Sequence, residues 1–478
     1  MSGPHLHVAE RSACYQAIKN IESIGWPTVP LSKAVEINPK TDRSLLADNT
    51  EVTFVPMAAV EAASGRVDTS TVRRYEEVKK GYTHFRDGDV LFAKITPCME
   101  NGKMAVVQSL RNGIGLGSTE FHVLRPREGV DPHYVYYFVS SKRYRSEAAH
   151  HMTGAVGQKR VPVSFLEQSE IPLPSPTEQR RIVAEIEKQF SRLEEAVDGL
   201  QRVKANLKRY KAAVLKAAVE GRLVPIEADL ARREGRNYET GTQLLQRILD
   251  TRRSQWQGKG KYKEPAAPDT TNLPELPEGW TWATYAQIGN VTTGFTPPTA
   301  DTANFGGDVP FIKPTDLDAG DNVVTAREYL SAQGIAKGRK LPIDSVLVTC
   351  IGATIGKTGL ARVECATNQQ INAVSFAESS LVPDYVYSWT VSPAGQRQIV
   401  DNASATTLPI LNKSKFEALA VAVPPLAEQR RIVDEVDRLL SIAREAEAAV
   451  ETNLKRAQSL RQTILSQAFT TSQGMSQA

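Results

Sequence analysis

The chain is poor in the residues from which metal and redox sites are built. Its four cysteines contain no Cys-x-x-Cys pair, which argues against a zinc ribbon or a dithiol redox site. All seven histidines lie at or before His151, so the C-terminal two thirds has no histidine for metal or proton chemistry. We therefore predict no metal site, and we interpret His150 and His151 as a surface pair at a helix end. The cysteines are Cys14, Cys98, Cys350 and Cys365, which as free thiols are typical of a reducing cytoplasm.

Long hydrophobic runs are also absent. No stretch of about 18 apolar residues occurs, so we expect no transmembrane helix. The first residues lack the basic and apolar regions of a secretory signal, and we expect a cytoplasmic protein. Neither sign of charge dominates, because 58 basic residues face 54 acidic ones for a net charge of +4. That balance permits nucleic acid as a partner without arguing for it.

The 478 residues exceed what one compact core holds, and the sequence contains an internal repeat. The six residues Glu178–Val183 recur as Glu428–Val433, 250 positions later. The preceding segments match more loosely, for example Gly102-Lys103 with Gly356-Lys357. The repeat predicts a tandem duplication in which each globular domain is followed by a long helix.

Both copies of the repeated segment have heptad periodicity, which is typical of a coiled coil. The first copy places on the a and d positions Val183, Ile186, Phe190, Leu193, Val197, Leu200, Leu207 and Val214. The second places there Val433, Val436, Leu440, Ala443, Val450, Leu454, Ala457 and Ile464. Charged residues interrupt both seams, at Lys204, Lys211, Glu447 and Arg461. We expect the two helices to pack on each other antiparallel, rather than each only on its own domain.

The fold class predicted is α+β, with two similar globular domains joined by an antiparallel coiled coil and related by a pseudo-two-fold repeat. Strands are expected at Val90–Ala93, Thr119–Leu124 and Val346–Thr349, and helix starts at Asp131-Pro132 and Pro383-Asp384. The predicted boundaries are an N-terminal extension 1–25, domain 26–175, helix 176–220, linker 221–278 with a short helix near 240–256, domain 279–425, helix 426–470 and a disordered tail 471–478.

No catalytic set is apparent, and we predict no catalytic residue. Gly352–Thr358 resembles a phosphate-binding loop, but it has three residues between its glycines where four are needed. Its Gly-Lys turn either presents N–H groups and an ammonium to a phosphate or is a structural turn with a solvated lysine. The Asn-Pro-Pro-aromatic motif of adenine methyltransferases is missing, and Asp68 with Glu77 and Lys79 only loosely resembles a nuclease carboxylate set.

The best candidate DNA-binding surface combines the Gly-Lys turn, the strand after it and the loop before the long helix. Gln and Asn pair with adenine, Arg and Lys with guanine, and Glu accepts from cytosine. Ser118–Glu120 aligns with Asn368–Gln370 at the 250-residue offset, so the framework matches while the polar side chains differ. Ordinary polar loops remain the alternative. The candidates are Lys94, Asn101, Lys103, Ser118, Thr119, Glu120, Gln158, Lys159 and Arg160 in the first half, and Lys313, Lys357, Asn368, Gln369, Gln370, Thr406 and Thr407 in the second.

The second globular half is a weak phosphate binder by composition. Residues 279–425 contain 10 basic and 12 acidic side chains. Because DNA affinity depends on neutralising phosphates, a basic partner would have to help this half to hold DNA.

These features together resemble the specificity subunit of Type I restriction-modification enzymes, over about residues 25–470. The resemblance is carried by Ile95–Lys103, Gly117–Phe121, Thr367–Asn372 and the two Pro…Glu-Gln-Arg-Arg-Ile-Val helix starts. It implies that each globular half is a target recognition domain that reads half of a bipartite, asymmetric site on double-stranded DNA. The helices would set the spacing between the half-sites.

The resemblance also implies partners. The helices would dock two modification subunits, which bind S-adenosylmethionine and methylate adenine N6, and restriction subunits that use ATP and Mg²⁺ would join that core. The chain itself would be non-catalytic and bind no cofactor, and nothing is implied for residues 1–25 or 221–278. The alternative is a structural coiled-coil adaptor without sequence-specific DNA binding.

Overall fold

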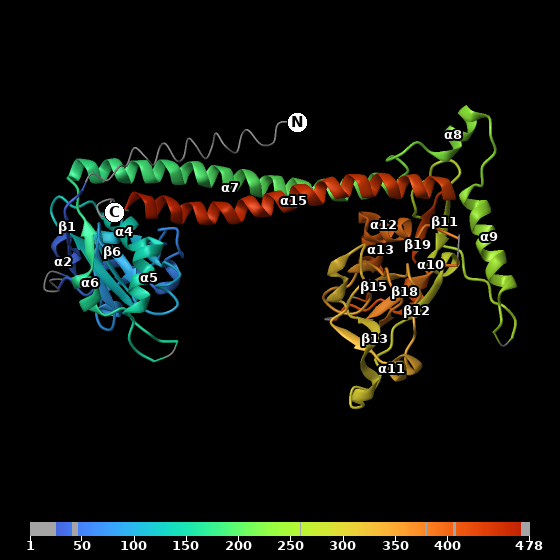
Figure 1. Ribbon diagram of the computed structural model, residues 1–478, viewed down its shortest axis with the longest axis horizontal. Coiled ribbons are helices and arrows are strands. Elements are labelled where there is room, and N and C mark those ends of the chain that lie inside the picture. The colour runs from blue at the N-terminus through green and yellow to red at the C-terminus, as the bar shows by residue number, and fades with distance from the viewer. Residues whose placement is uncertain are drawn as a thin grey trace, which may run out of the picture. The chain divides into compact units, whose positions relative to one another are not determined.

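The computed structural model describes residues 25–40, 46–155, 157–258, 260–377, 380–404 and 408–469 (Figure 1). The predicted tail 471–478, all but Gly25 of the N-terminal extension, and the candidates Thr406 and Thr407 lie outside these residues. The chain divides into two compact units, Met1–Gln201 with Glu451–Ala478, and Arg202–Val450. In the described ranges no helix has the length and apolarity needed to cross a bilayer.

The first unit is built on two four-stranded sheets. One is antiparallel, in the order β2-β9-β6-β7. The other has the order β4-β3-β8-β5, with a parallel β3–β8 pair, and β1 pairs with β10 antiparallel. The strands are β1 (Thr28–Pro30), β2 (Val35–Ile37), β3 (Glu51–Val55), β4 (Val72–Arg74), β5 (Thr83–Arg86), β6 (Val90–Ala93), β7 (Met104–Val106), β8 (Ile114–Gly117), β9 (Phe121–Pro126) and β10 (Glu170–Pro172).

Short helices cover these sheets. Asp131 caps α4 by accepting hydrogen bonds from the backbone N–H groups of His133 and Tyr134, and Pro132 occupies the first turn, as predicted. The first unit contains α2 (Leu31–Ala34), α3 (Tyr75–Val78), α4 (Pro132–Ser140), α5 (Lys142–His150), α6 (Val163–Gln168) and the 3₁₀ turns η1 (Met57–Ala59) and η2 (Arg111–Gly113).

The second unit repeats the four-stranded antiparallel sheet and the parallel strand pair of the first, which confirms the predicted duplication. Its four-stranded sheet has the order β12-β18-β15-β16, and β14-β13-β17 again contains a parallel pair, β13–β17. Strand β11 pairs with β19 as β1 pairs with β10. The strands are β11 (Thr281–Thr284), β12 (Asn290–Thr293), β13 (Phe305–Ile312), β14 (Glu328–Leu330), β15 (Val346–Thr349), β16 (Thr358–Leu360), β17 (Ala366–Thr367), β18 (Ile371–Ser375) and β19 (Ala420–Val423).

The linker belongs structurally to the second unit. The predicted helix is α9 (Gly241–Ser254), which opens with a capping box between Thr240 and Gln243 and packs Leu244 and Ile248 into the core of this unit. A second helix, α8 (Glu227–Glu234), was not expected. The other helices are α10 (Tyr285–Ile288), α11 (Ala332–Lys337), α12 (Pro383–Val391), α13 (Pro393–Asn402), α14 (Lys413–Glu417) and the 3₁₀ turns η3 (Thr302–Asn304) and η4 (Asp316–Ala319).

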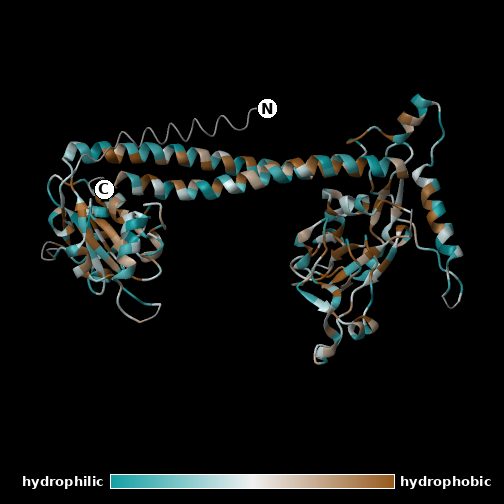
Figure 2. Cartoon of the chain, in the orientation of Figure 1, coloured by the Kyte–Doolittle hydropathy of each residue, from teal (hydrophilic) through white to brown (hydrophobic). Residues whose placement is uncertain are grey.

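The long helices are α7 (Pro176–Val219) and α15 (Leu426–Ala468). Both are largely hydrophilic with recurring hydrophobic residues, whereas the strands inside the units are mainly hydrophobic (Figure 2). Ser175 caps α7 by accepting from the backbone N–H of Glu178 at 3.3 Å, but the Glu178 carboxylate pairs with Arg181 at 2.6 Å. A capping box between Ser175 and Glu178 is therefore only half formed.

The helices pack antiparallel and also join the domain cores. In the first unit, Ile186 of the early part of α7 shares a core with Leu465 of the late part of α15. In the second unit, Val214 of the late part of α7 shares a core with Ile432 of the early part of α15. The expectation that the helices pack on each other is confirmed, and each unit in addition contains part of both helices.

Three of the charged residues that interrupt the predicted seams have partners across the coiled coil. Lys211 and Glu447 form an ion pair at 2.7 Å. The Arg461 guanidinium lies 4.0 Å from the centre of the Phe190 ring and 3.6 Å from the Glu194 carboxylate. Since opposite charges and a cation over an aromatic face attract, these residues stabilise the antiparallel register.

Candidate nucleic-acid interface

Three loops of the first unit meet at the ends of β6 and β9. The backbone N–H of Lys94 donates to the Glu120 carbonyl at 2.9 Å, and the N–H of Val161 donates to the Lys94 carbonyl at 2.9 Å. Next to them, the N–H of Thr96 donates to the Lys159 carbonyl at 3.0 Å. This backbone network brings together the predicted residues around 94, 118–120 and 158–160, which are far apart in the sequence.

An ion pair joins two of these loops. The Arg160 Nε and Nη2 atoms donate to the two Glu120 carboxylate oxygens, at 2.9 and 2.8 Å, and Nη1 donates to the Gln158 carbonyl at 3.1 Å. The hydrogen bonds from Arg160 lower the pKa of Glu120, so its carboxylate is ionised. Partial burial lowers the pKa of the nearby Lys94, while the Glu120 charge acts in the opposite direction.

The other candidates of this half lie outside the ion pair of Glu120 and Arg160. The Ser118 hydroxyl accepts from the Glu120 N–H at 3.2 Å and holds the turn, which leaves Thr119 exposed at its tip. Asn101 is exposed in the turn after β6. The Lys103 Nζ donates to the Met57 carbonyl at 3.0 Å, so this lysine binds η1 rather than the Glu120 group.

A buried polar support lies behind this edge. His122 contacts the Val161 carbonyl through Nε2 at 2.9 Å and the Asn38 amide nitrogen through Nδ1 at 3.0 Å. The Asn38 amide oxygen accepts from the Val123 N–H at 3.0 Å, which orients the amide so that its nitrogen faces the histidine. The imidazole is therefore neutral with its proton on Nε2, and burial lowers its pKa below 6.5.

A cavity of about 510 Å³ adjoins Lys94 and Phe121. Sequence reasoning missed its remaining lining residues because they come from the segment after β2, from β5 and the residue before it, and from β9, and no shared motif marks them. They are Asn38, Pro39, Lys40, Tyr82, Thr83, His84 and Val123.

The second unit has the same backbone network with different side chains. The N–H of Cys350 donates to the Gln370 carbonyl at 2.7 Å, and the N–H of Leu411 donates to the Cys350 carbonyl at 2.8 Å. Ile351 forms an antiparallel bridge with Ile410, as Ile95 does with Arg160. Position by position, Lys94, Glu120 and Arg160 of the first unit are therefore replaced by Cys350, Gln370 and Ile410.

The neutral group of the second unit is held by amides. Asn368 accepts from the Gln370 N–H at 3.2 Å through its side-chain oxygen and donates to the Gln370 side-chain oxygen at 2.9 Å. The Thr296 hydroxyl donates to the Gln369 side-chain oxygen at 2.6 Å. Burial raises the pKa of the Cys350 thiol to about 12, so it stays neutral. The predicted alignment of Ser118–Glu120 with Asn368–Gln370 is confirmed by these equivalent contacts.

The two candidate lysines of this half are paired with acids. Lys357 lies 2.7 Å from Asp318, and Lys313 pairs with Glu328 and lies over the Phe311 ring. In the Gly-Lys turn the N–H of Lys357 donates to the Thr354 carbonyl at 3.0 Å and that of Gly356 to Thr349 at 2.9 Å. Internal hydrogen bonds thus use these two N–H groups, which favours a structural turn over a phosphate cradle.

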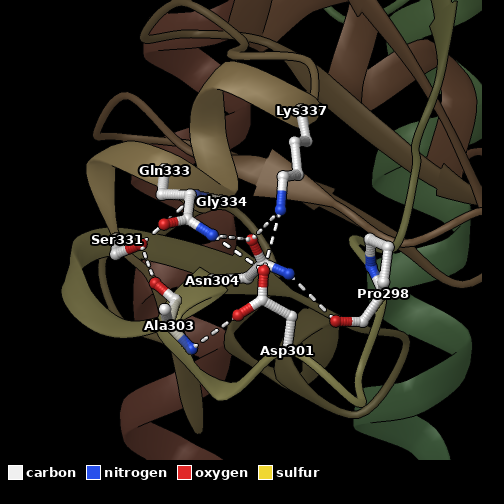
Figure 3. A network of polar contacts seen from close by, with 8 residues as sticks. All are labelled: Pro298, Asp301, Ala303, Asn304, Ser331, Gln333, Gly334 and Lys337. Carbon is white, nitrogen blue, oxygen red and sulfur yellow. Dashed lines mark hydrogen bonds and ion pairs between the residues drawn. The ribbon is translucent and has the colours of Figure 1, made fainter.

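A second polar group of this unit lies where the 298–304 segment meets α11 (Figure 3). The Asn304 side chain is fully buried, donates to the Pro298 carbonyl at 2.9 Å and accepts from Lys337 Nζ at 2.9 Å. Lys337 also donates to Asp301 at 2.9 Å. This network anchors a loop that sequence reasoning did not single out. Within the described residues, no three His, Cys, Asp or Glu side chains come together as a metal site would require.

Comparisons with known proteins agree with this duplicated architecture. The sequence model for the Type I restriction modification DNA specificity domain matches residues 24–199 and 277–456. The specificity subunit of the Type I restriction enzyme EcoAI from Escherichia coli is 33% identical over 316 residues, which is 57% of this chain and 52% of the relative. The EcoEI specificity subunit from the same species is 32% identical over 57% of this chain and 52% of its own length. The chain thus aligns with about half the length of these relatives.

Two solved structures have a similar fold. One is a chain from a study of complex assembly and conformational transition of the type I R-M system, with a TM-score of 0.65 over 93% of this chain and 98% of that one. The other is the HsdS subunit from Thermoanaerobacter tengcongensis, with a TM-score of 0.56 over 94% and 97% of the two chains. Each of these structures is 21% identical in sequence to this chain, so the comparison shows similarity of fold.

Proposed function

Because the chain belongs to the family defined by the Type I restriction modification DNA specificity domain, we propose that it is the non-catalytic, DNA-reading subunit of a Type I restriction-modification complex. Each unit reads one half of a bipartite, asymmetric site on double-stranded DNA. Fold similarity alone would not justify a function, so the proposal depends on what the two units present at equivalent positions.

One observation carries the proposal: the two units have the same backbone contacts at this place but present different side chains on them. The first unit presents the charged set Lys94, Glu120 and Arg160, and the second presents Gln370 beside two apolar side chains. Base edges are distinguished by their patterns of donors and acceptors, so different side chains at the same place read different bases. Two half-sites of unlike sequence are the expected result.

In this proposal the long helices set the gap between the half-sites and dock the other subunits. Two adenine-N6 methyltransferase subunits that bind S-adenosylmethionine attach to the coiled coil, and restriction subunits that use ATP and Mg²⁺ join through them. The similarity to a chain from a type I R-M system supports this assembly. Since the second half contains more acidic than basic residues over 279–425, the partner subunits supply cations that hold the DNA phosphates.

A methylome tests the proposal. N6-methyladenine is mapped in the source cell with and without the gene for this chain, and again after a plasmid copy is returned. Loss of one split motif on deletion, and its return on complementation, is the expected result. A structural adaptor without sequence-specific binding would give the same methylated motifs in all three strains, as would any function unrelated to DNA.

A further inference from the structure

The side chain of Arg160 is oriented before any ligand arrives. Its planar guanidinium has five N–H donors, and the contacts with Glu120 and the Gln158 carbonyl engage three of them. One N–H therefore stays on each terminal nitrogen, outside the contacts made by the described part of the chain. The side chain is 44% exposed, so these two donors are accessible to a large ligand.

Glu120 is engaged in this arrangement through both carboxylate oxygens. Each of its carboxylate oxygens accepts one hydrogen bond from Arg160, and the side chain is only 25% exposed. The effect of this pairing is to restrict the rotation of the arginine, so that less conformational entropy is lost when the guanidinium binds its target.

Two N–H donors on the terminal nitrogens of a planar group suit guanine. In the major groove a guanine presents its N7 and O6 atoms side by side as acceptors, and no other base presents two acceptors in this arrangement. A phosphate also accepts two hydrogen bonds from an arginine, but it carries no sequence information. A contact with guanine should therefore make binding depend on the DNA sequence, whereas a contact with phosphate should not.

We propose that Arg160 reads a guanine in the half-site bound by the first unit and that Glu120 is its positioning residue. This inference rests on the proposed function. The second unit has Ile410 in place of Arg160 and Gln370 in place of Glu120, so its half-site is read without an arginine at this place. The difference between these two positions then contributes directly to the asymmetry of the site.

The test uses the complex reconstituted from the full chain and its modification subunits. Its duplex contains the motif found in the methylome, and each base pair of the first half-site is replaced in turn. Dissociation constants are measured at one salt concentration for the wild-type complex and for Arg160→Ala, Arg160→Lys and Glu120→Gln. Arg111→Ala is the matched control, because Arg111 is also exposed and pairs with a glutamate of the same unit, Glu51, at 2.7 Å.

In the wild-type complex, replacement of one particular guanine should weaken binding by about 5- to 150-fold, the range for a bidentate base contact. Arg160→Ala should abolish that discrimination and leave it intact at the other positions. Arg160→Lys retains the charge but lacks the planar fork, so it should lose the same discrimination with a smaller loss of general affinity. Glu120→Gln should lose part of it, and Arg111→Ala none.

Two results would overturn the inference. If Arg160→Ala weakens binding equally for every duplex, the side chain contacts a phosphate. If Arg160→Ala affects discrimination no more than Arg111→Ala does, Arg160 does not read a base. Failure of the wild-type complex to distinguish the motif from unrelated DNA would instead refute the proposed function, so the two failures are separable.

Discussion

The first unit should depend for its stability on Phe469, which directly follows α15. Phe469 is 8% exposed, and its ring packs edge-to-face on Tyr134 at 5.2 Å and on Phe138 at 5.5 Å between ring centres. Removal of a buried phenylalanine side chain costs about 3–5 kcal/mol from lost burial and the cavity left behind. Because Phe469 lies at a helix end, where neighbours can collapse into the space, we expect Phe469→Ala to cost about 3 kcal/mol.

Hydrogen exchange measured by mass spectrometry resolves this effect by unit. A loss of about 3 kcal/mol corresponds to roughly 100-fold faster exchange for amides that open with the first unit. Peptides from α4 should show this acceleration, and peptides from α12 should not. The control is Leu460→Ala on the same helix, where the side chain is 44% exposed and less than about 0.5 kcal/mol is expected. Equal effects of the two variants, or unchanged exchange in α4, would show that the helix end does not stabilise this unit.

Three further outcomes are expected. A seven-residue insertion in both α7 and α15, at the division between the units, keeps the heptad register and adds about 10 Å of helix. The gap between the two halves of the methylated motif should therefore grow by about three base pairs, with both half-sites unchanged. Altered half-sites would contradict the idea that the helices set the gap. His122→Asn should make the stability of the first unit fall less steeply as the pH is lowered. The lowered His122 pKa means that the folded state binds fewer protons than the unfolded state below about pH 6.5, where stability therefore falls as pH falls; a urea-unfolding midpoint that falls as steeply as in the wild type would refute this. A double-mutant cycle on Lys211 and Glu447, which are 32% and 30% exposed, should give a coupling of about 0.5–1 kcal/mol, whereas additive effects would mean that the pair contributes nothing.

Local patterns predicted the two long helices, α9, the starts of α4 and α12, and the strands β6, β9 and β15. The long helices were predicted to within two residues at each end because heptad periodicity and the N-terminal prolines are local signals. Strand β9 was predicted at Thr119–Leu124 but begins at Phe121, since the Ser118 hydroxyl and carbonyl hold the preceding residues in a turn. A serine that bonds its own backbone competes with strand formation, and alternation of hydrophobic residues does not show this.

Helix α8 was missed because long-range contacts stabilise its start. It has no side-chain cap, and Glu227 in its first turn is 2% exposed between Arg236 at 2.5 Å and Arg431 at 2.7 Å. The backbone N–H of Glu227 also donates to the Glu428 carboxylate at 2.8 Å. Two of these three partners lie about 200 residues away, so no local pattern marks this helix.

The sequence by itself determined the duplication, the antiparallel coiled coil and the two sets of polar residues at equivalent positions, because repeats and periodicity depend on residue order alone. The tertiary structure decided which of those polar groups are engaged. Glu120 and Arg160 are 40 residues apart and meet only because β6, β9 and the loop before α6 share backbone hydrogen bonds. A hydrogen bond between distant residues depends on how loops come together in space, and that arrangement pairs the Glu120 carboxylate with the Arg160 guanidinium.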